Sequence, residues 1–126
     1  MRRRLYGEDA RHSEIAPVLN NIGAEYSKQK GELSMKEAIS YCERALEMQT
    51  KLYEKPDGKH PDLIETLENL SAYYSTVLDE EKSLKYARQA YGMQTHLFPN
   101  VDHLRTARLL LRIGKSYANL ATFIEQ

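Results

Sequence analysis

One short sequence recurs three times in this chain and sets the spacing of everything else. Met48-Gln-Thr-Lys-Leu-Tyr53 returns as Met93-Gln-Thr-His-Leu-Phe98 and, more loosely, as Met1-Arg-Arg-Arg-Leu-Tyr6. Counted between their leucines, the copies are 47 and 45 residues apart, at Leu5, Leu52 and Leu97. Periods of this size are typical of stacked supersecondary units. The sequence therefore predicts an array of repeats. Because Met1 stands where Met48 and Met93 stand late in a unit, we expect the array to belong to a longer one.

Charge and cysteine content narrow the function classes. The 126 residues include 18 basic and 18 acidic side chains, so no global field draws the chain to nucleic acid or an acidic membrane. The one cysteine, Cys42, cannot form an internal disulfide, which favours a reducing compartment. No segment has the roughly 18 to 20 apolar residues of a membrane span, and no apolar signal segment follows the first arginines. We therefore expect a cytoplasmic protein.

Apolar residues recur at helical spacing in five segments and nowhere alternate as in a strand, which predicts an all-α protein. Three segments share one pattern and are predicted near residues 14–29, 61–78 and 102–124. The other two carry small residues at regular intervals and are predicted near 34–53 and 80–97. The expected order is two helical hairpins and a terminal helix in a single domain, residues 1–126. Its repeats are predicted at about 5–51, 52–96 and, as a partial third, 97–126.

Local signals set the expected helix ends. Residues 5–13 are polar and contain Gly7, so they are predicted to be a connection that ends at a capping serine, Ser13. Pro17 would then lie in the first helical turn. Further start signals are the Ser34–Glu37 capping box, Pro61 at a first helical position and Asp79 as a cap.

In register, the three like helices read Leu19-Asn-Asn-Ile-Gly-Ala-Glu-Tyr26, Leu67-Glu-Asn-Leu-Ser-Ala-Tyr-Tyr74 and Leu110-Leu-Arg-Ile-Gly-Lys-Ser-Tyr117. This pattern resembles the first helix of the tetratricopeptide repeat, in which a large residue is followed by Leu-Gly and then Tyr. The small residues of the family's second helix correspond to Ala38, Cys42 and Ala45, and to Ser83, Ala87 and Ala90. The words Leu-Tyr-Gly-Glu-Asp and Lys-His-Pro-Asp resemble the kinesin light chain type of long repeat. The resemblance covers almost the whole chain and implies a right-handed α-α superhelix with a concave groove.

The resemblance also implies candidate binding residues. In the family, the residue just before the Leu-Gly pair commonly holds peptide backbone or carboxylates, and that place falls on Asn21, Asn69 and Arg112. An amide can bind an extended backbone through both its oxygen and its nitrogen, and a guanidinium suits a carboxylate. Solvated helix faces are the alternative interpretation. The other groove candidates are Asn20, Lys28, Glu65, Glu68, Arg108, Lys115 and Asn119, with Ala24 and Ala72 beside them.

Other reactive residue types are assigned structural roles. The histidines recur once per repeat and do not converge as zinc ligands must, so caps or loop positions are predicted for His12, His60, His96 and His103. Cys42 lies among small apolar positions without a base partner, which predicts a packed thiol. The series Tyr26, Tyr74 and Tyr117 predicts packing between helices. The sequence contains no motif for catalysis, metal or cofactor, so we expect neither an enzyme nor a cofactor.

These observations predict a non-catalytic protein-interaction module, a scaffold or adaptor that binds a peptide or helix of a partner protein in its groove. An acidic residue of the peptide is expected near Arg112. A second hypothesis makes the chain the recognition or regulatory segment of a larger enzyme or motor assembly. RNA binding is least favoured, because only the last helix hints at a basic stripe. The last helix also leaves an apolar side, which suggests a homodimer.

Overall fold

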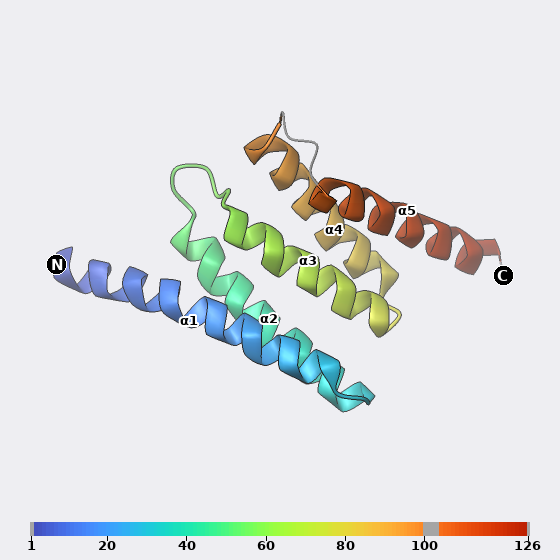
Figure 1. Cartoon of the computed structure of the whole chain (residues 1–126), viewed down its shortest axis with the longest axis horizontal. Helices are drawn as coiled ribbons and strands as arrows, with labels where there is room; N and C mark the ends of the chain where they lie inside the picture. The colour runs from blue at the N-terminus through green and yellow to red at the C-terminus, as the bar shows by residue number, and fades with distance from the viewer. Residues whose placement is uncertain (1, 100–103, 126) are drawn as a thin grey trace. The chain divides into compact units, whose positions relative to one another are not determined.

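The chain is described by a computed structural model (Figure 1). The structure describes the backbone of residues 2–99 and 104–125, and the side chains of residues 13–99 and 104–122. These residues form five α-helices and no strand, which confirms the predicted all-α class. The helices fall into two compact units: unit 1 extends to Lys59 and contains α1 and α2, and unit 2 begins at His60 and contains α3, α4 and α5.

Unit 1 is a helical hairpin of α1, Arg2–Lys28, and α2, Glu32–Leu52, which runs back along α1 (Figure 1). Its apolar cluster joins buried Ala16 and Leu19 of α1 to Ala45 of α2. Gly23 brings the two backbones close together. A Cβ atom on Gly23 would lie 3.0 Å from the carbonyl oxygen of Ala38, so only glycine fits there without displacing the neighbouring helix.

Two predicted helix starts in unit 1 are wrong. Residues 5–13 are part of α1, and Pro17 lies inside that helix instead of in its first turn. Four of these nine residues, Leu5, Glu8, Ala10 and Arg11, are good helix formers, and one glycine costs a helix only about 1 kcal/mol. Because proline has no amide hydrogen, Pro17 leaves the Ser13 carbonyl without its helical donor. The helix α2 begins at Glu32, because Gly31 turns the chain at φ 117°, and Ser34 does not act as a cap.

Unit 2 contains α3, Pro61–Thr76, α4, Glu80–Leu97, and α5, Leu104–Glu125. Its predicted start signals are confirmed. Pro61 is the first residue of α3, and the imidazole of His60 caps that helix by accepting a hydrogen bond from the Asp62 amide. The Asp79 carboxylate accepts one from the Lys82 amide and caps α4.

The α3–α4 hairpin is joined by a buried pair of serines in place of the glycine and alanine of unit 1. The hydroxyl of Ser71 donates to the carbonyl of Ser83, and the hydroxyl of Ser83 donates to the carbonyl of Ser71, both at 2.8 Å. Both side chains are fully buried. The hairpin core is otherwise apolar and includes Ile64, Leu70 and Ala87. The serine pair therefore satisfies its own hydroxyls inside an apolar environment.

Tyrosines pack between the helices of both hairpins, as predicted for Tyr26 and Tyr74. The ring of Tyr26 stacks on Tyr41 at 5.6 Å between centroids, and the ring of Tyr74 stacks on Tyr86 at 5.7 Å. The prediction is wrong for Tyr117, whose side chain is half exposed. In the described residues no helix lies over it in the way that α2 and α4 cover the other two tyrosines.

Candidate functional site

The candidate residues of unit 2 lie on neighbouring faces of α3 and α5, which meet at a partly buried carboxylate. Glu68 of α3 forms ion pairs with two arginines of α5: Nε of Arg108 lies 2.7 Å from its Oε1, and Nε of Arg105 lies 3.4 Å from its Oε2 without a hydrogen bond. Only 13% of the Glu68 side chain is exposed. One carboxylate thus holds two arginines of α5 in place, and the pairs are partly shielded from water and salt.

Three cations of α5 form a row along this side of the helix. Arg108, Arg112 and Lys115 are spaced four and three residues apart, which puts them on one helix face, here called the basic strip. Arg108 joins the strip to α3 through Glu68. Lys115 is exposed. The strip and Arg105 together carry four basic side chains on α5, and Glu68 is the carboxylate of α3 that contacts them.

Arg112 differs from Arg105 and Arg108 because no carboxylate of the described residues forms an ion pair with it. Its side chain is half-buried, and its Nε atom is buried without a hydrogen-bond acceptor among the described residues. A buried N–H without a partner costs about 1 to 3 kcal/mol, and more when the group is charged. Arg112 is therefore the group on this face that would gain most from a carboxylate.

The remaining candidates of unit 2 are arranged around the strip. Asn119 donates from Nδ2 to the Glu80 carboxylate of α4 at 3.2 Å, so this amide is engaged within the molecule. Glu65 is exposed and Asn69 is half-buried on α3. The structure thus brings Glu68 and Arg108 into direct contact and ties Asn119 to α4.

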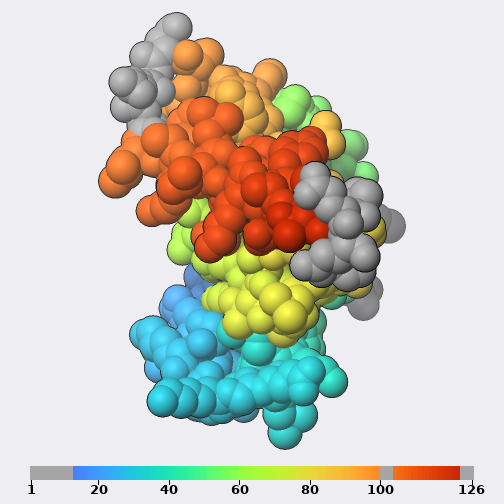
Figure 2. All heavy atoms as spheres, turned by 90° about the vertical axis from the view of Figure 1, so that its right-hand side faces the viewer, coloured from blue at the N-terminus to red at the C-terminus, as the bar shows by residue number. Residues whose placement is uncertain are grey.

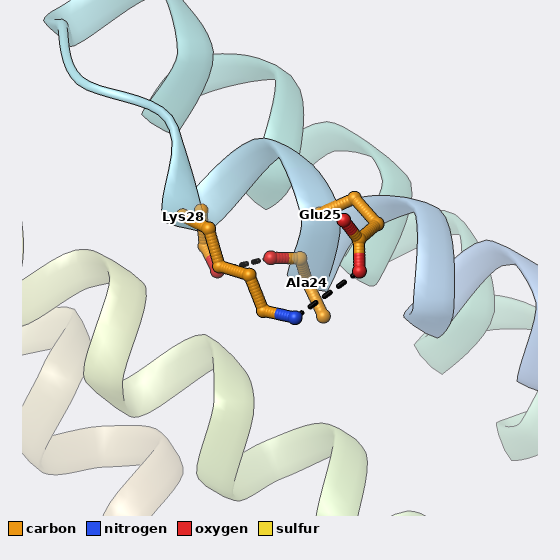
Figure 3. Close-up of polar contacts among 4 residues, drawn as sticks. Ala24, Glu25 and Lys28 are labelled. Carbon is orange, nitrogen blue, oxygen red and sulfur yellow. Dashed lines mark hydrogen bonds and ion pairs between the residues drawn. The ribbon is translucent and has the colours of Figure 1, made fainter.

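The three candidates of unit 1 lie on α1. Asn21 is exposed, whereas Asn20 is half-buried and accepts a hydrogen bond from the thiol of Cys42 at 3.4 Å. Figure 3 shows Lys28 pairing with Glu25, one helical turn earlier, at 3.1 Å. Both partners are about 70% exposed, so this pair contributes little to stability. Cys42 itself is 1% exposed, as predicted for a packed thiol.

Two contributors to this site were missed by sequence reasoning. Arg105 was not a candidate, although it shares Glu68 with Arg108, and Glu80 was not expected to bind Asn119. The spacing of three residues between Arg105 and Arg108 would have placed both on one face of α5. The contact of Asn119 with Glu80 spans two helices and has no comparable local signal.

The two histidines whose side chains are described, His60 and His96, lie at helix ends. His60 caps α3 as predicted, and His96 is exposed near the end of α4. His12 and His103 lie outside the residues whose side chains are described. Within residues 13–99 and 104–122, no three His, Cys, Asp or Glu side chains are grouped so that they could hold a metal ion. None of the helices in the described part of the chain combines the length and apolar character needed to cross a membrane.

Comparison with known families gives one clear match. The model of the tetratricopeptide repeat matches residues 14–96, about two-thirds of the chain. The chain belongs to the tetratricopeptide repeat family. Repeats of this family generally mediate protein–protein interactions and are typically non-catalytic. The search of curated proteins found no match.

Proposed function

We propose that the face shared by α3 and α5 binds an extended acidic segment of a partner protein, with one carboxylate of that segment on Arg112. The observation that carries this proposal is the half-buried side chain of Arg112, a cation without an ion pair among the described residues. A carboxylate that reaches the accessible part of this side chain would supply an acceptor and the opposite charge, and such charge-assisted hydrogen bonds are about twice as strong as neutral ones.

The contacts of Glu68 support the same surface. By holding Arg105 and Arg108, this carboxylate fixes two cations in place before any ligand arrives. Ordering long side chains in advance lowers the entropic cost of binding. Asn69, half-buried on α3, offers both a donor and an acceptor to a peptide backbone. The residues predicted for peptide contact in unit 2 therefore have complementary roles in this proposal.

A selection from a random peptide library tests this function even while the natural partner is unidentified. The whole chain is used to select displayed peptides, and their affinities are then measured with the wild type, Arg112→Glu and Arg88→Glu. We expect enrichment of acidic peptides whose dissociation constants rise about ten-fold or more with Arg112→Glu. Arg88 is an exposed arginine of α4 and not part of the basic strip, so Arg88→Glu is the matched control and should bind as the wild type does.

Equal binding by the wild type and Arg112→Glu would exclude this site. A chain that selects no acidic peptide, but binds single-stranded RNA with an affinity that falls steeply as salt is raised, would support the RNA alternative instead. If Arg112→Glu and Arg88→Glu weaken the binding of acidic peptides equally, the peptides respond to the net charge of the protein and not to a site at Arg112.

The type of repeat, the cellular role and the location predicted from the sequence are part of the same proposal. We infer a kinesin light chain-like type of long repeat from the two recurring words, and an adaptor role in the cytoplasm from the charge and cysteine content. The alternative role, as the recognition or regulatory segment of a larger enzyme or motor assembly, would use the same face. Contacts of Asn20, Asn21 and Lys28 with a peptide stay predictions.

A further inference from the structure

The helix α5 has a second surface, separate from the basic strip, that is apolar and uncovered in the described residues. Leu110 is 49% exposed, Tyr117 is 50% exposed, and Gly114 is exposed between them. Figure 2 shows α5 at the surface of unit 2. Its covered side is elsewhere, at Leu109 and Ser116, which are buried. The open face is defined here as Leu110, Gly114, Tyr117, Ala118 and Ala121.

The positions equivalent to Leu110, Gly114 and Tyr117 are covered in both helical hairpins, α1–α2 and α3–α4. Leu19, Gly23 and Tyr26 of α1 correspond to Leu110, Gly114 and Tyr117, and so do Leu67, Ser71 and Tyr74 of α3. In α1 and α3, the leucine and the small residue are buried, and the tyrosine stacks on a second ring. In α5, a Cβ atom added to Gly114 would meet nothing within 4 Å. The open face of α5 thus has the form of a helix–helix interface whose second helix is missing from the described residues.

The helices that cover these positions share a four-position pattern. In α2 it is Ala38-x-x-Tyr41-Cys42-x-x-Ala45, and in α4 it is Ser83-x-x-Tyr86-Ala87-x-x-Ala90. The small residues permit close approach, and the tyrosine supplies the second ring of the stack. The helix α5 contains this pattern as well, in Gly114-x-x-Tyr117-Ala118-x-x-Ala121. Neither α1 nor α3 has it, because Lys30 and Leu78 stand where the last alanine would be.

We propose that the open face of α5 pairs with the open face of a second copy of this chain, with the two helices antiparallel. In unit 1, Leu19 packs with Ala45, and Gly23 lies against the backbone and Cβ of residues 38–42. The same register in a pair of α5 helices sets Leu110 against Ala121 of the partner subunit and Gly114 against Tyr117 of the partner subunit. This register is unchanged when the two copies are exchanged, as a two-fold symmetric dimer requires. The proposal does not depend on the peptide site.

The exposed apolar area suits a weak dimer. Leu110 and Tyr117 of the open face are 49% and 50% exposed, and Leu104 and Leu111, which flank it on α5, are 79% and 75% exposed. With these flanking leucines the exposed surface is on the order of 500 Å², as large as the largest patch of a typical monomer. Two such patches, flanking leucines included, would bury at most about 1,000 Å² in total, which is near the lower limit for a specific interface. The basic strips of the two copies would lie along one edge of the pair, so their repulsion should decrease as salt is added.

Sedimentation of the whole chain at concentrations from micromolar to millimolar tests the dimer. We expect the mass to rise from 14.6 kDa toward twice that value, and the dissociation constant to fall or stay constant as salt is raised. Gly114→Leu should increase the dissociation constant about ten-fold or more, because the added side chain prevents close approach. The matched control is Gly92→Leu on α4, where an added Cβ also meets nothing within 4 Å, and it should dimerise as the wild type does.

Circular dichroism establishes that each variant is folded. If Gly114→Leu does not fold, Ala118→Glu replaces it, because Ala118 is exposed and its replacement puts a charge in the middle of the open face. A mass of 14.6 kDa at every concentration would overturn the proposal. Dimerisation of Gly114→Leu or Ala118→Glu with the wild-type constant would also overturn it, as would a dimer that dissociates when salt is raised.

Discussion

At the residue scale, three equivalent positions show how one side chain sets the distance between two helices. Gly23 allows the carbonyl of Ala38 to approach α1, Ser71 binds Ser83 through hydrogen bonds, and Gly114 faces open space. The sequence pattern identifies all three as small positions beside a large apolar residue. Their environments differ because of what the next helix brings to each, which local sequence does not encode.

Replacing Gly23 by valine should lower the free energy of unfolding by about 2 kcal/mol, because the added Cβ would lie 3.0 Å from a backbone oxygen that can move only with its helix. Urea denaturation followed by circular dichroism measures this change. Gly92→Val is the matched control, since nothing lies within 4 Å of a Cβ at Gly92 and valine has a slightly higher helix propensity than glycine. Equal stability of the two variants would show that α1 and α2 are not in close contact at Gly23.

At the element scale, the two hairpins join their helices by different means at the same register position. Unit 1 uses a glycine against an alanine, and unit 2 uses two serines that hydrogen-bond each other's carbonyls. The two hydroxyl oxygens also lie 3.2 Å apart, so each hydroxyl contacts the other as well as a carbonyl, and removal of both leaves an apolar contact of the kind found in unit 1.

The serine pair should therefore show coupling in a double-mutant cycle. Ser71→Ala and Ser83→Ala should each lower the free energy of unfolding by about 1 kcal/mol, and the double variant should lose less than the sum of the two. Thermal or urea unfolding of the four proteins gives the coupling energy. Ser40→Ala on the exposed side of α2 is the control and should be neutral. Strictly additive losses would mean that the two hydroxyls act independently.

The elements themselves could largely be predicted from the sequence, and their contacts could not. Helical periodicity found all five helices, and the caps His60 and Asp79 were correct because capping depends on residues close in sequence. The start of α1 was missed because Gly7 and Pro17 suggested a break that the rest of the segment overrides. Gln49 and Gln94 of the repeated Met-Gln-Thr word are buried, although their polarity predicts exposure.

At the scale of the whole molecule, each unit is built from helices that cannot bury their apolar faces alone, as is usual for repeat proteins. Unit 2 adds α5 to its hairpin, and this helix carries both surfaces for which we propose partners. The basic strip borders α3 through Glu68, and the open face contains Gly114 and Tyr117. Because the two surfaces lie on different sides of α5, Arg112→Glu should weaken peptide binding and leave dimerisation unchanged. Gly114→Leu should weaken dimerisation and leave peptide binding unchanged.

The most direct test of the central claim is chemical-shift mapping of a selected acidic peptide on the isotopically labelled chain. If the α3–α5 face is the binding site, the largest changes should occur at Asn69, Arg112 and Lys115, and the side-chain resonances of Arg112 should shift as its guanidinium gains a carboxylate. Arg112→Glu should abolish these changes at the same peptide concentration. Changes confined to the outer face of α4, around Leu84 and Arg88, or a pattern unaffected by Arg112→Glu, would contradict the account.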